Sequence, residues 1–312
     1  MTEPVPAAVR ILGLRRDFGH LRAVDGIDLE IPAGAVFGLL GPDGAGKSTL
    51  LRMLATVLTP SAGEALVFGD PVGRPTPALT GRIGYMAQRF SMYPDLSVAE
   101  NLDFFARVRG VPRGPRRERA AELLDRMGLT AFAGRQARNL SGGMKQKLML
   151  ASTLMHDPDL LLLDEPTTGV DPVSRREFWE ILARVHAEGR TVVVSTPYMD
   201  EASRCSQIGF MSQGRITHTG TPAELSAAVP GTLLEVTAAD SRAALAALPG
   251  LVGLLDAHLL GDTVRVLVDA PAADAPAAVA AHLAASGIEA EAAAIPTDME
   301  TVFAHLAGEE AA

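Results

Sequence analysis

A glycine-rich stretch, GPDGAGKST (Gly41–Thr49), has the residue types and spacing that bind phosphate groups. It matches the pattern G-x-x-x-x-G-K-[ST], follows an apolar run and precedes the helical sequence LLRMLATVL. Glycine lets the backbone approach a phosphate closely, so that amide N–H groups and the start of a helix face the anion. Lys47 is then positioned for the β- and γ-phosphates and Ser48 for Mg²⁺. The stretch predicts a nucleoside triphosphate site formed by Gly41, Pro42, Asp43, Gly44, Ala45, Gly46, Lys47, Ser48 and Thr49.

The distribution of lysine supports this prediction. Only three of the 28 basic side chains are lysines, namely Lys47, Lys145 and Lys147. A compact ammonium group fits among phosphate oxygens where a planar guanidinium does not. The retention of lysine at position 47 in an arginine-rich chain therefore indicates a phosphate contact.

Two adjacent carboxylates follow a run of four leucines, in the sequence LLLLDEP. Acidic groups at the end of a buried strand need a function, because an unpaired charge is costly to bury. We predict that Asp164 holds Mg²⁺ through its water shell, and that Glu165 accepts a proton from the attacking water or orients it.

The elements that must position these residues are those of an α/β fold. The segments 35–41, 159–166 and 191–197 are continuous apolar runs, which is typical of strands covered on both faces of a mainly parallel sheet. Ligands bind at the carboxyl ends of such strands. Between about Gln88 and Asp157 the strand signals fade and helical spacing takes over, which predicts an inserted helical subdomain.

Composition and charge divide the chain near Pro230. Residues 231–312 carry 12 acidic and 2 basic side chains, whereas residues 1–230 carry 25 acidic and 26 basic ones. We predict a larger domain over residues 1–230 and a small acidic α+β domain, resembling a split βαβ unit, over residues 231–312. An acidic domain repels phosphate backbones, so no nucleic-acid partner is expected. The single cysteine, Cys205, and the absence of a secretory signal or a long apolar run predict a cytosolic chain that meets a membrane only through a partner.

The sequence LSGGMKQ (Leu140–Gln146), which lies between the two nucleotide motifs, resembles the signature of ATP-binding-cassette (ABC) ATPases. The resemblance extends over residues 9 to about 225 and implies a P-loop NTPase with a mainly parallel sheet core, an antiparallel β edge and an inserted helical subdomain. It further implies that two cassettes pair head to tail. Ser141, Gly142 and Gly143 of one cassette then meet the γ-phosphate held by Lys47 of the other.

Other positions resemble further motifs of the family. Phe18 resembles the aromatic residue that stacks on adenine, and Gln88 resembles the glutamine that links Mg²⁺ and water to the permease. Asp171, in GVDP, resembles the interface aspartate. The alternative for Phe18 is a residue that fills the core or a turn.

Finer matches, such as GYMAQRFSMYPDLSVAENL and YMDEA, resemble the ATPases of ABC-2-type exporters, and most of all the amino-terminal ATPase half of tandem drug-export ATPases. That resemblance implies three partners: an ABC-2-type permease, a second cassette in a homodimer or heterodimer, and a membrane-fusion adaptor reached through the permease. It also implies ATP and Mg²⁺ as cofactors and a place on the inner face of the cell membrane. The C-terminal domain resembles the accessory domain of many such ATPases.

Two residues depart from the family pattern. Pro197 stands where the family places a histidine that contacts the γ-phosphate, and proline offers no side-chain donor and no N–H. Asp43 stands where asparagine is usual and adds negative charge beside the phosphates. Pro197 motivates the hypothesis that this subunit's own site hydrolyses ATP slowly while its LSGGMKQ completes a more active site on a partner. The alternative is a homodimer in which Glu165, Mg²⁺ and Lys47 suffice.

Three functions therefore remain open from the sequence. The first, which the motifs favour, is the ATPase of an ABC-2-type exporter. The second is a soluble cassette ATPase that acts on ribosomes or DNA, and the acidic C-terminal domain counts against it. The third is a nucleotide-binding regulatory subunit with little turnover, which only Pro197 favours.

Overall fold

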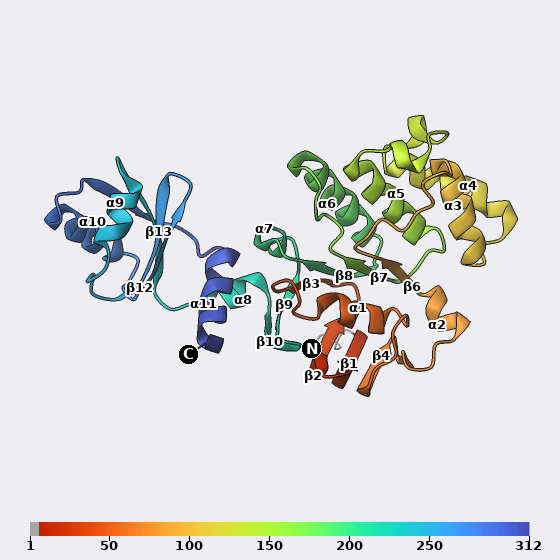
Figure 1. Ribbon diagram of the computed structural model, residues 1–312, viewed down its shortest axis with the longest axis horizontal. Helices are drawn as coiled ribbons and strands as arrows, with labels where there is room; N and C mark the ends of the chain where they lie inside the picture. Colours follow the sequence, from red (N-terminus) through yellow and green to blue (C-terminus); the bar gives the residue numbers. More distant parts are fainter. Residues whose placement is uncertain (1–5, 312) are drawn as a thin grey trace, which may run out of the picture. The chain divides into compact units, whose positions relative to one another are not determined.

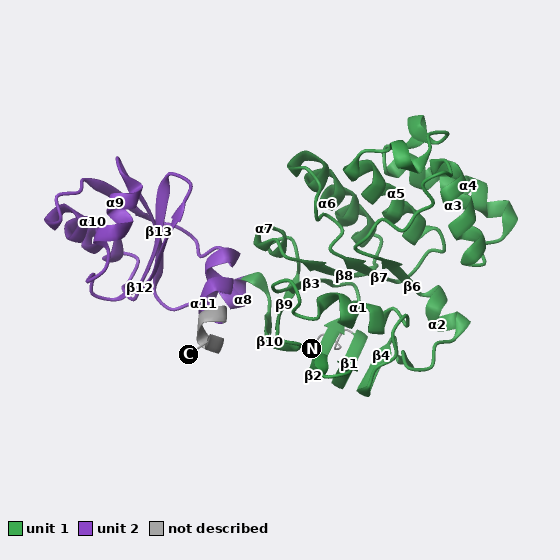
Figure 2. Cartoon of the chain, viewed as in Figure 1, with its two compact units in different colours: residues 1–222 green, residues 223–312 purple. Residues whose placement is uncertain are grey.

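The computed structural model describes residues 6–311 and divides the chain into two compact units, residues 1–222 and 223–312 (Figure 2). Helix α8 (Pro222–Ala228) falls at the start of the second unit, whereas the composition of the chain changes only near Pro230. Leu225 is buried, and the hydroxyl of Ser226 donates a hydrogen bond to the carbonyl of Thr297. The hydrogen bond ties α8 to the C-terminal unit.

A six-stranded sheet forms the centre of the first unit (Figure 1). The three apolar runs of the sequence lie in its middle as neighbouring parallel strands whose residues are all buried. This arrangement confirms the predicted mainly parallel core. The strand order is β10 (Arg215–Gly220), β9 (Gln207–Ser212), β3 (Val36–Leu40), β8 (Thr191–Thr196), β7 (Leu160–Asp164) and β6 (Ile83–Met86), and only β10 is antiparallel to its neighbour.

A second, antiparallel sheet forms the β edge that the resemblance implies. Its strands, in order, are β2 (Leu21–Pro32), β1 (Ala7–Phe18), β4 (Ala62–Val67) and β5 (Asp70–Pro71). Buried side chains of this sheet share one hydrophobic core with Leu50 and Leu54 of helix α1 (Lys47–Leu54) and with Phe37 of β3. Because α1 is fixed by this core, its N-terminus is held at the end of β3.

Helices dominate residues 88–157, as predicted. They are α3 (Val98–Val108), α4 (Arg113–Arg126) and α5 (Gly142–Leu154), with short 3₁₀ turns at Thr130–Phe132 and Ala137–Asn139, and they gather near the β6 edge of the central sheet (Figure 1). The remaining helices of this unit are α2 (Pro77–Gly81), α6 (Pro172–His186) and α7 (Met199–Ala202). A capping box of Ser97 and Glu100 starts α3, because each side chain bonds the backbone N–H of the other residue.

The C-terminal unit has the element order β-α-β-β-α-β, followed by a further helix. Its elements are β11 (Thr232–Ala238), α9 (Ser241–Ala247), β12 (Leu254–Leu260), β13 (Thr263–Val268), α10 (Ala275–Ala285), β14 (Ala290–Ala294) and α11 (Met299–Ala311). The strands form an antiparallel sheet in the order β12-β13-β11-β14, and one sheet face shares a core with α9 and α10. This is the split βαβ arrangement.

The cysteine is part of the core of the first unit. Cys205 is buried, and the Cβ that a side chain at Gly38 would carry lies only 2.8 Å from its sulfur atom. Burial raises the pKa of the Cys205 thiol to about 12, so the thiol stays protonated at neutral pH. None of the helices among residues 6–311 is both long and apolar enough to cross a membrane.

Candidate functional site

The glycine-rich loop connects the end of β3 to the start of α1, as the sequence predicts. Gly41 has a φ of 147°, and a Cβ there would lie 2.0 Å from the carbonyl oxygen of Met211. Gly46 has a φ of 106°, and its Cβ would lie 2.2 Å from the carbonyl oxygen of Ala23. Only glycine fits these positions. The loop therefore keeps a tight path that leaves the N-terminus of α1 at its centre.

Lys47 lies within this loop and is 3% exposed. Its ammonium group donates hydrogen bonds to the carbonyl oxygens of Gly41, at 2.7 Å, and Pro42, at 2.9 Å. The same nitrogen lies 3.7 Å from Oε1 of Glu165. One cation thus joins the glycine-rich loop to the second of the two predicted carboxylates, although they are more than a hundred residues apart in the sequence.

Asp164 ends β7 and is fully buried, and three hydroxyl groups converge on its carboxylate. Ser48 Oγ lies 2.8 Å and Ser195 Oγ 3.0 Å from Oδ1, and the hydroxyl of Tyr85 lies 3.3 Å from Oδ2. Burial raises the pKa of the Tyr85 hydroxyl above its ordinary value, and the negative charge of Asp164 acts in the same direction. Tyr85 therefore remains a hydrogen-bond donor at neutral pH.

Glu165 begins the turn after β7 and is 6% exposed. Its φ of 47° lies in the left-handed region, which is rare for a residue with a side chain and costs of order 1 kcal/mol. Its amide N–H donates to Ser195 Oγ, and its Oε2 accepts hydrogen bonds from Gln88 Nε2 at 2.8 Å and Thr168 Oγ1 at 3.3 Å. The structure therefore brings Gln88, Glu165 and Lys47 together.

A buried hydrogen bond anchors the turn that carries Glu165. Thr167 Oγ1 donates to Oε1 of Glu201, at 2.7 Å, and Glu201 is 1% exposed on α7. The other carboxylate oxygen, Oε2, is buried without a hydrogen-bond partner in the described part of the chain. The segment that follows β8 thus fixes the position of this turn.

The sequence did not single out Tyr85, Ser195, Thr168, Thr167 or Glu201. One signal pointed to Ser195, because it lies at the carboxyl end of a predicted parallel strand, where ligands bind. In the structure it lies opposite Asp164 in the ladder of β7 and β8. The remaining contacts depend on how the strands are ordered in the sheet, which local sequence patterns do not report.

The LSGGMKQ segment forms the start of α5. Ser141 caps this helix, and its side chain accepts a hydrogen bond from the amide of Met144 at 3.3 Å. A Cβ at Gly143 would lie 2.6 Å from the side chain of Ser174 on α6, so glycine is needed for the close approach of the two helices. Ser141 and Gly142 are exposed, which leaves the start of α5 open to an anion.

Asp171 caps helix α6 in the same way. Its carboxylate accepts a hydrogen bond from the amide of Ser174, at 3.0 Å, and this bond holds the pKa of Asp171 below its usual range. In the described part of the chain, neither Ser141 nor Asp171 is hydrogen-bonded to the glycine-rich loop. A single chain therefore does not join the LSGGMKQ segment to its own phosphate site through these groups.

Phe18 lies at the end of β1 and is 44% exposed. The guanidinium group of Arg16 lies over its ring, 4.6 Å from the centroid. The residue is thus not part of the core, but it directly precedes the turn at Gly19 and His20, so a turn residue remains the alternative to adenine stacking. It offers an exposed aromatic surface.

The two departures from the family pattern, Pro197 and Asp43, differ in burial. Pro197 directly follows β8. Pro197 is half-buried and Asp43 is exposed in the glycine-rich loop. The amide of Tyr198 donates to Thr196 Oγ1, so the hydroxyl at the end of β8 is already engaged. The nearest preceding histidine, His186, contacts the carbonyl of Arg190 before β8 begins, at the opposite end of that strand.

The oxygen atoms around Asp164 are of the kind that Mg²⁺ prefers. Ser48 and Asp164 present a hydroxyl and a carboxylate oxygen 2.8 Å apart. Gln88 adds an amide group, which is hydrogen-bonded to Glu165, the residue next to Asp164. No cluster of three or more His, Cys, Asp or Glu side chains suited to a metal is present among residues 6–311. Mg²⁺ in nucleotide sites is usually held by one or two protein groups plus phosphate oxygens, so this donor set fits it.

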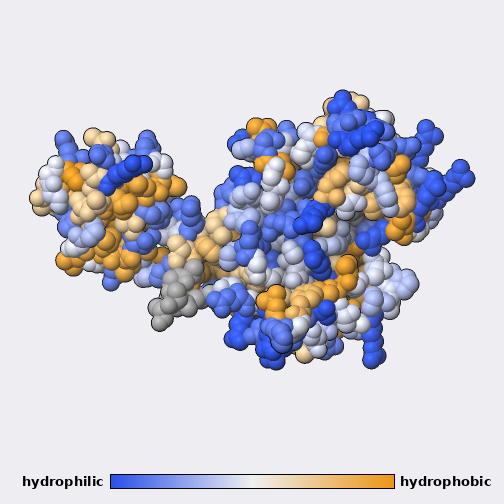
Figure 3. All heavy atoms as spheres, viewed as in Figure 1, coloured by the Kyte–Doolittle hydropathy of each residue, from blue (hydrophilic) through white to orange (hydrophobic). Residues whose placement is uncertain are grey.

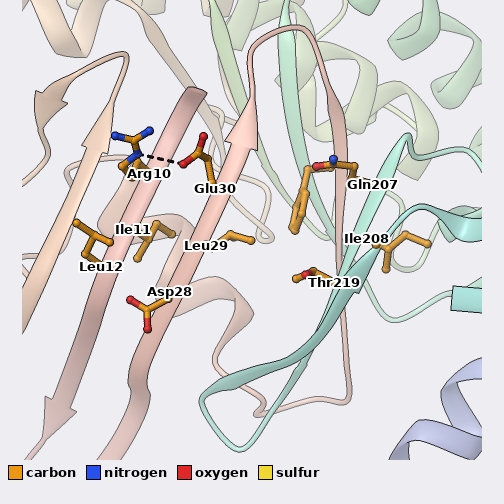
Figure 4. A pocket seen from close by; sticks show the side chains of 11 residues that line it. Arg10, Ile11, Leu12, Asp28, Leu29, Glu30, Gln207, Ile208 and Thr219 are labelled. Carbon is orange, nitrogen blue, oxygen red and sulfur yellow. Dashed lines mark hydrogen bonds and ion pairs between the residues drawn. The ribbon is translucent and has the colours of Figure 1, made fainter. Parts of the chain in front are cut away.

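A separate cavity of about 470 Å³ lies away from the predicted site residues (Figure 4). The exposed ion pair of Arg10 and Glu30 stands at one side of it, and Gln207 and Thr219 lie at the other. Gln207 is the first residue of β9, so this cavity is near the amino ends of the parallel strands. The glycine-rich loop is at their carboxyl ends, where nucleotides bind.

Comparison with known proteins decides the family. The family described as ABC transporter matches residues 24–168. The daunorubicin resistance ATP-binding protein DrrA3 of Streptomyces coeruleorubidus is 38% identical over 312 aligned positions, which cover 97% of this chain and 96% of that protein. The chain belongs to the ABC transporter ATP-binding protein family. As a member of that family it is an ATPase, and its relatives include multidrug and drug-resistance ABC transporter ATP-binding proteins.

Another relative of this ABC ATPase is longer. The probable multidrug ABC transporter ATP-binding protein YbhF of Escherichia coli is 42% identical over 267 residues, which cover 84% of this chain and 46% of YbhF. The chain therefore matches less than half of that protein.

Solved structures agree on the fold of the ABC ATPase. CbiO1 from Clostridium perfringens, part of the ABC transporter complex CbiONQ, has a TM-score of 0.65 and 29% identity, covering 71% of this chain and 91% of its own. The ATP-binding cassette MJ0796, in a dimeric post-hydrolysis state bound to ADP and Pi, has a TM-score of 0.63 and 27% identity, covering 68% and 98%. These likenesses confirm the P-loop NTPase cassette.

Proposed function

We propose that this ABC ATPase binds ATP on the glycine-rich loop of residues 41–49, with Lys47 at the β- and γ-phosphates. The observation that carries the proposal is the convergence of Lys47, Ser48, Asp164 and Glu165 within direct contact distances. The ammonium of Lys47 donates hydrogen bonds to loop carbonyls. Phosphate oxygens offer the same nitrogen stronger, charged acceptors, so the loop is already organised around the cation.

We assign Mg²⁺ to Ser48, Asp164 and Gln88. The Ser48 hydroxyl and the Asp164 carboxylate, 2.8 Å apart, are oxygen ligands that would hold the ion. The chemistry that such an ion would supply is neutralisation of negative charge on the phosphate oxygens. Ser195 and Tyr85 keep the Asp164 carboxylate fixed, because each donates a hydrogen bond to it.

We assign the role of general base to Glu165. The carboxylate is buried, and its two oxygens are held by Lys47 on one side and by Gln88 and Thr168 on the other. A carboxylate fixed in this way can accept a proton from a water molecule that attacks the γ-phosphate. Gln88 orients Glu165 from the loop after β6 and so links the site to the helical region.

A complete site requires a second cassette in this proposal. Ser141, Gly142 and Gly143 lie at an open helix start and are not bonded to the chain's own loop. In a head-to-tail pair they face the γ-phosphate bound by the other cassette, with Asp171 at the interface. The dimeric state of MJ0796 supports such pairing. Phe18 then stacks on adenine through its exposed ring.

We propose further that the chain drives an ABC-2-type exporter of drug-like compounds from the cytoplasmic face of the membrane. The names of DrrA3, YbhF and linearmycin resistance protein LnrL support an exporter, and no nucleic-acid partner is proposed. In this proposal a separate permease supplies the pathway across the membrane. A membrane-fusion adaptor, contacted through the permease, is proposed on the sequence resemblance alone. The C-terminal unit is assigned a regulatory or assembly role.

An aromatic cluster on the helical region offers the surface for the permease. Tyr93 is 48% exposed, its ring centroid lies 4.7 Å from that of Phe104, and Phe104 lies 5.3 Å from Phe105. We expect Phe104→Asp to lower the fraction of the chain that sediments with host-cell membranes by roughly tenfold, because aromatic residues dominate the energy of interfaces. Immunoblotting of washed membranes measures this fraction.

The matched control for this variant is Phe132→Asp, which changes another aromatic residue of the helical region that lies beside Arg135. It should leave membrane association unchanged, and both variants should bind ATP normally. Membrane association of Phe104→Asp equal to that of the unmodified chain would exclude this surface.

A second candidate function, a subunit with low turnover, is favoured by Pro197. If the missing imidazole limits the site, Pro197→His should raise kcat for ATP hydrolysis by about tenfold or more, because one added hydrogen-bond donor at a transition-state charge is worth up to 10²–10³-fold. Steady-state phosphate release measures kcat. The control is Pro197→Ala, which restores a backbone N–H without an imidazole. Equal kcat for the unmodified chain and Pro197→His would show that Glu165, Mg²⁺ and Lys47 suffice.

A further inference from the structure

Strand β12 of the C-terminal unit has a palindromic sequence. Its residues, LLDAHLL (Leu254–Leu260), read the same in both directions about Ala257, except that Asp256 on one side corresponds to His258 on the other. An acid and a base therefore occupy equivalent positions, and leucine occupies the positions beyond them. Such a strand is complementary to a second copy of itself in the antiparallel direction.

β12 is also the last strand of its sheet, since the order is β12-β13-β11-β14. An edge strand presents unpaired N–H and C=O groups to another chain. Leu255, Leu259 and Leu260 are 46%, 37% and 37% exposed, although leucine is seldom left on an edge that is meant to stay single. Hydrophobic residues gather on the visible face of this unit (Figure 3). β12 contains no Lys or Pro, the residues that usually prevent an edge strand from pairing with another chain.

The ladder with β13 fixes which backbone groups face outward. The two-residue loop Gly261–Asp262 joins the strands, and Leu260 pairs with Thr263 beside it. In such a hairpin the pair that flanks the loop is hydrogen-bonded, and the bonding alternates along the strand. The N–H and C=O of Leu259 and Ala257 therefore point away from β13. Ala257, the centre of the palindrome, thus has its backbone groups on the free edge.

We infer that β12 pairs with β12 of a second copy of this chain, antiparallel and with the two-fold axis at Ala257. Ala257 then exchanges two backbone hydrogen bonds with its equivalent, and Asp256 lies directly opposite His258 of the second copy. Within one chain His258 Nδ1 already lies 3.1 Å from Asp256 Oδ2, and both side chains are on the same sheet face. Pairing joins two carboxylates and two imidazoles in one cluster across the axis, where each facing carboxylate can accept a hydrogen bond from an imidazole N–H.

A β-bulge limits how far this pairing extends along β12. A register shift between Leu254 and Asp256 marks a β-bulge at Leu255, which ends the regular ladder there. The contact is therefore short and centred on residues 256–258, with Leu259 facing Leu255 of the second copy. Arg265 lies opposite His258 on β13 and is paired with Glu235, so its charge is already balanced.

Cysteine cross-linking of the full chain without nucleotide tests the register. In a Cys205→Ala background, which removes the single native cysteine, one preparation carries Asp256→Cys and a second, with a larger tag, carries His258→Cys. Facing residues of a non-hydrogen-bonded pair have Cα atoms about 4.5 Å apart, within disulfide range, whereas diagonal residues are about 7–8 Å apart. After oxidation, the mixture should give at least about tenfold more disulfide-linked dimer than either preparation alone. Equal yields in all three samples, or none in the mixture, overturn the inference.

Exchange of the two residues tests the charge pairing independently. Asp256→His and His258→Asp, each alone, put like groups opposite one another and should raise the dissociation constant of the nucleotide-free dimer about three- to tenfold, as expected for two facing pairs. The double variant Asp256→His/His258→Asp restores the complementarity and should return the constant to within about twofold of the unmodified chain. Sedimentation equilibrium measures the constant. A double variant as weak as the single ones, or a chain that stays monomeric, overturns the inference. Because no nucleotide is present, these results do not depend on the ATP site.

Discussion

Glu165→Gln is expected to lower kcat for ATP hydrolysis by about 10²–10⁴-fold while leaving ATP affinity within about threefold of the unmodified chain. The amide has the size and shape of the carboxylate and can keep the hydrogen bond with Gln88, but it cannot accept a proton from water. The loss therefore falls on the chemical step. Phosphate release under saturating ATP gives kcat, and equilibrium binding gives the affinity.

The matched control is Glu64→Gln on β4, which removes a charge from an exposed position of the antiparallel sheet. It should leave kcat and affinity unchanged. If Glu165→Gln kept more than about a tenth of the normal kcat, Glu165 would not be the general base. If it lost ATP affinity as strongly as kcat, its contact with Lys47 at 3.7 Å would be mainly a binding contact.

Lys47→Ala should weaken ATP binding about 10- to 100-fold. The ammonium is buried in the loop, and hydrogen bonds between charged groups are worth about 1.5–3 kcal/mol, of which each 1.4 kcal/mol is tenfold in affinity. The variant also leaves Glu165 without its only basic neighbour among the described ion pairs, so hydrolysis should fall below that of the unmodified chain even when ATP is saturating.

Lys147→Ala is the control for this change, because it removes another of the three lysines from an ion pair with Glu177. Its ATP affinity should equal that of the unmodified chain. Lys47→Arg adds a second comparison: it keeps the charge, but the guanidinium is too large for the space between the carbonyls of Gly41 and Pro42. Normal affinity in Lys47→Ala would rule out the proposed phosphate contact.

Local sequence patterns were sufficient to predict the elements that position the proposed phosphate site. The runs that form β3, β7 and β8 are apolar throughout, and all three are buried parallel strands in the structure. Because such strands present their carboxyl ends at one edge of the sheet, the sequence alone predicts that Lys47 and Asp164 lie near one another. Helix capping by Ser141 and Asp171 arises from equally local chemistry.

Contacts that depend on the order of the strands in the sheet could not be predicted from the sequence. Tyr85 reaches Asp164 because β6 lies beside β7, and Ser195 does so because β8 lies on the other side. Thr167 meets Glu201 only after the chain has passed through α6 and β8. The division after Pro222 likewise depends on tertiary contacts, such as the hydrogen bond from Ser226 to Thr297, which a change in charge composition does not register.

Binding of ATP by motifs that meet around Asp164 is tested most directly by isothermal titration of the unmodified chain with ATP, once with Mg²⁺ and once with a chelator. With Mg²⁺ we expect saturable binding below millimolar ATP, and clearly weaker binding when the metal is removed, because Ser48 and Asp164 would then have no metal ion to hold beside the phosphates. No binding at millimolar ATP, or the same affinity with and without Mg²⁺, would contradict it.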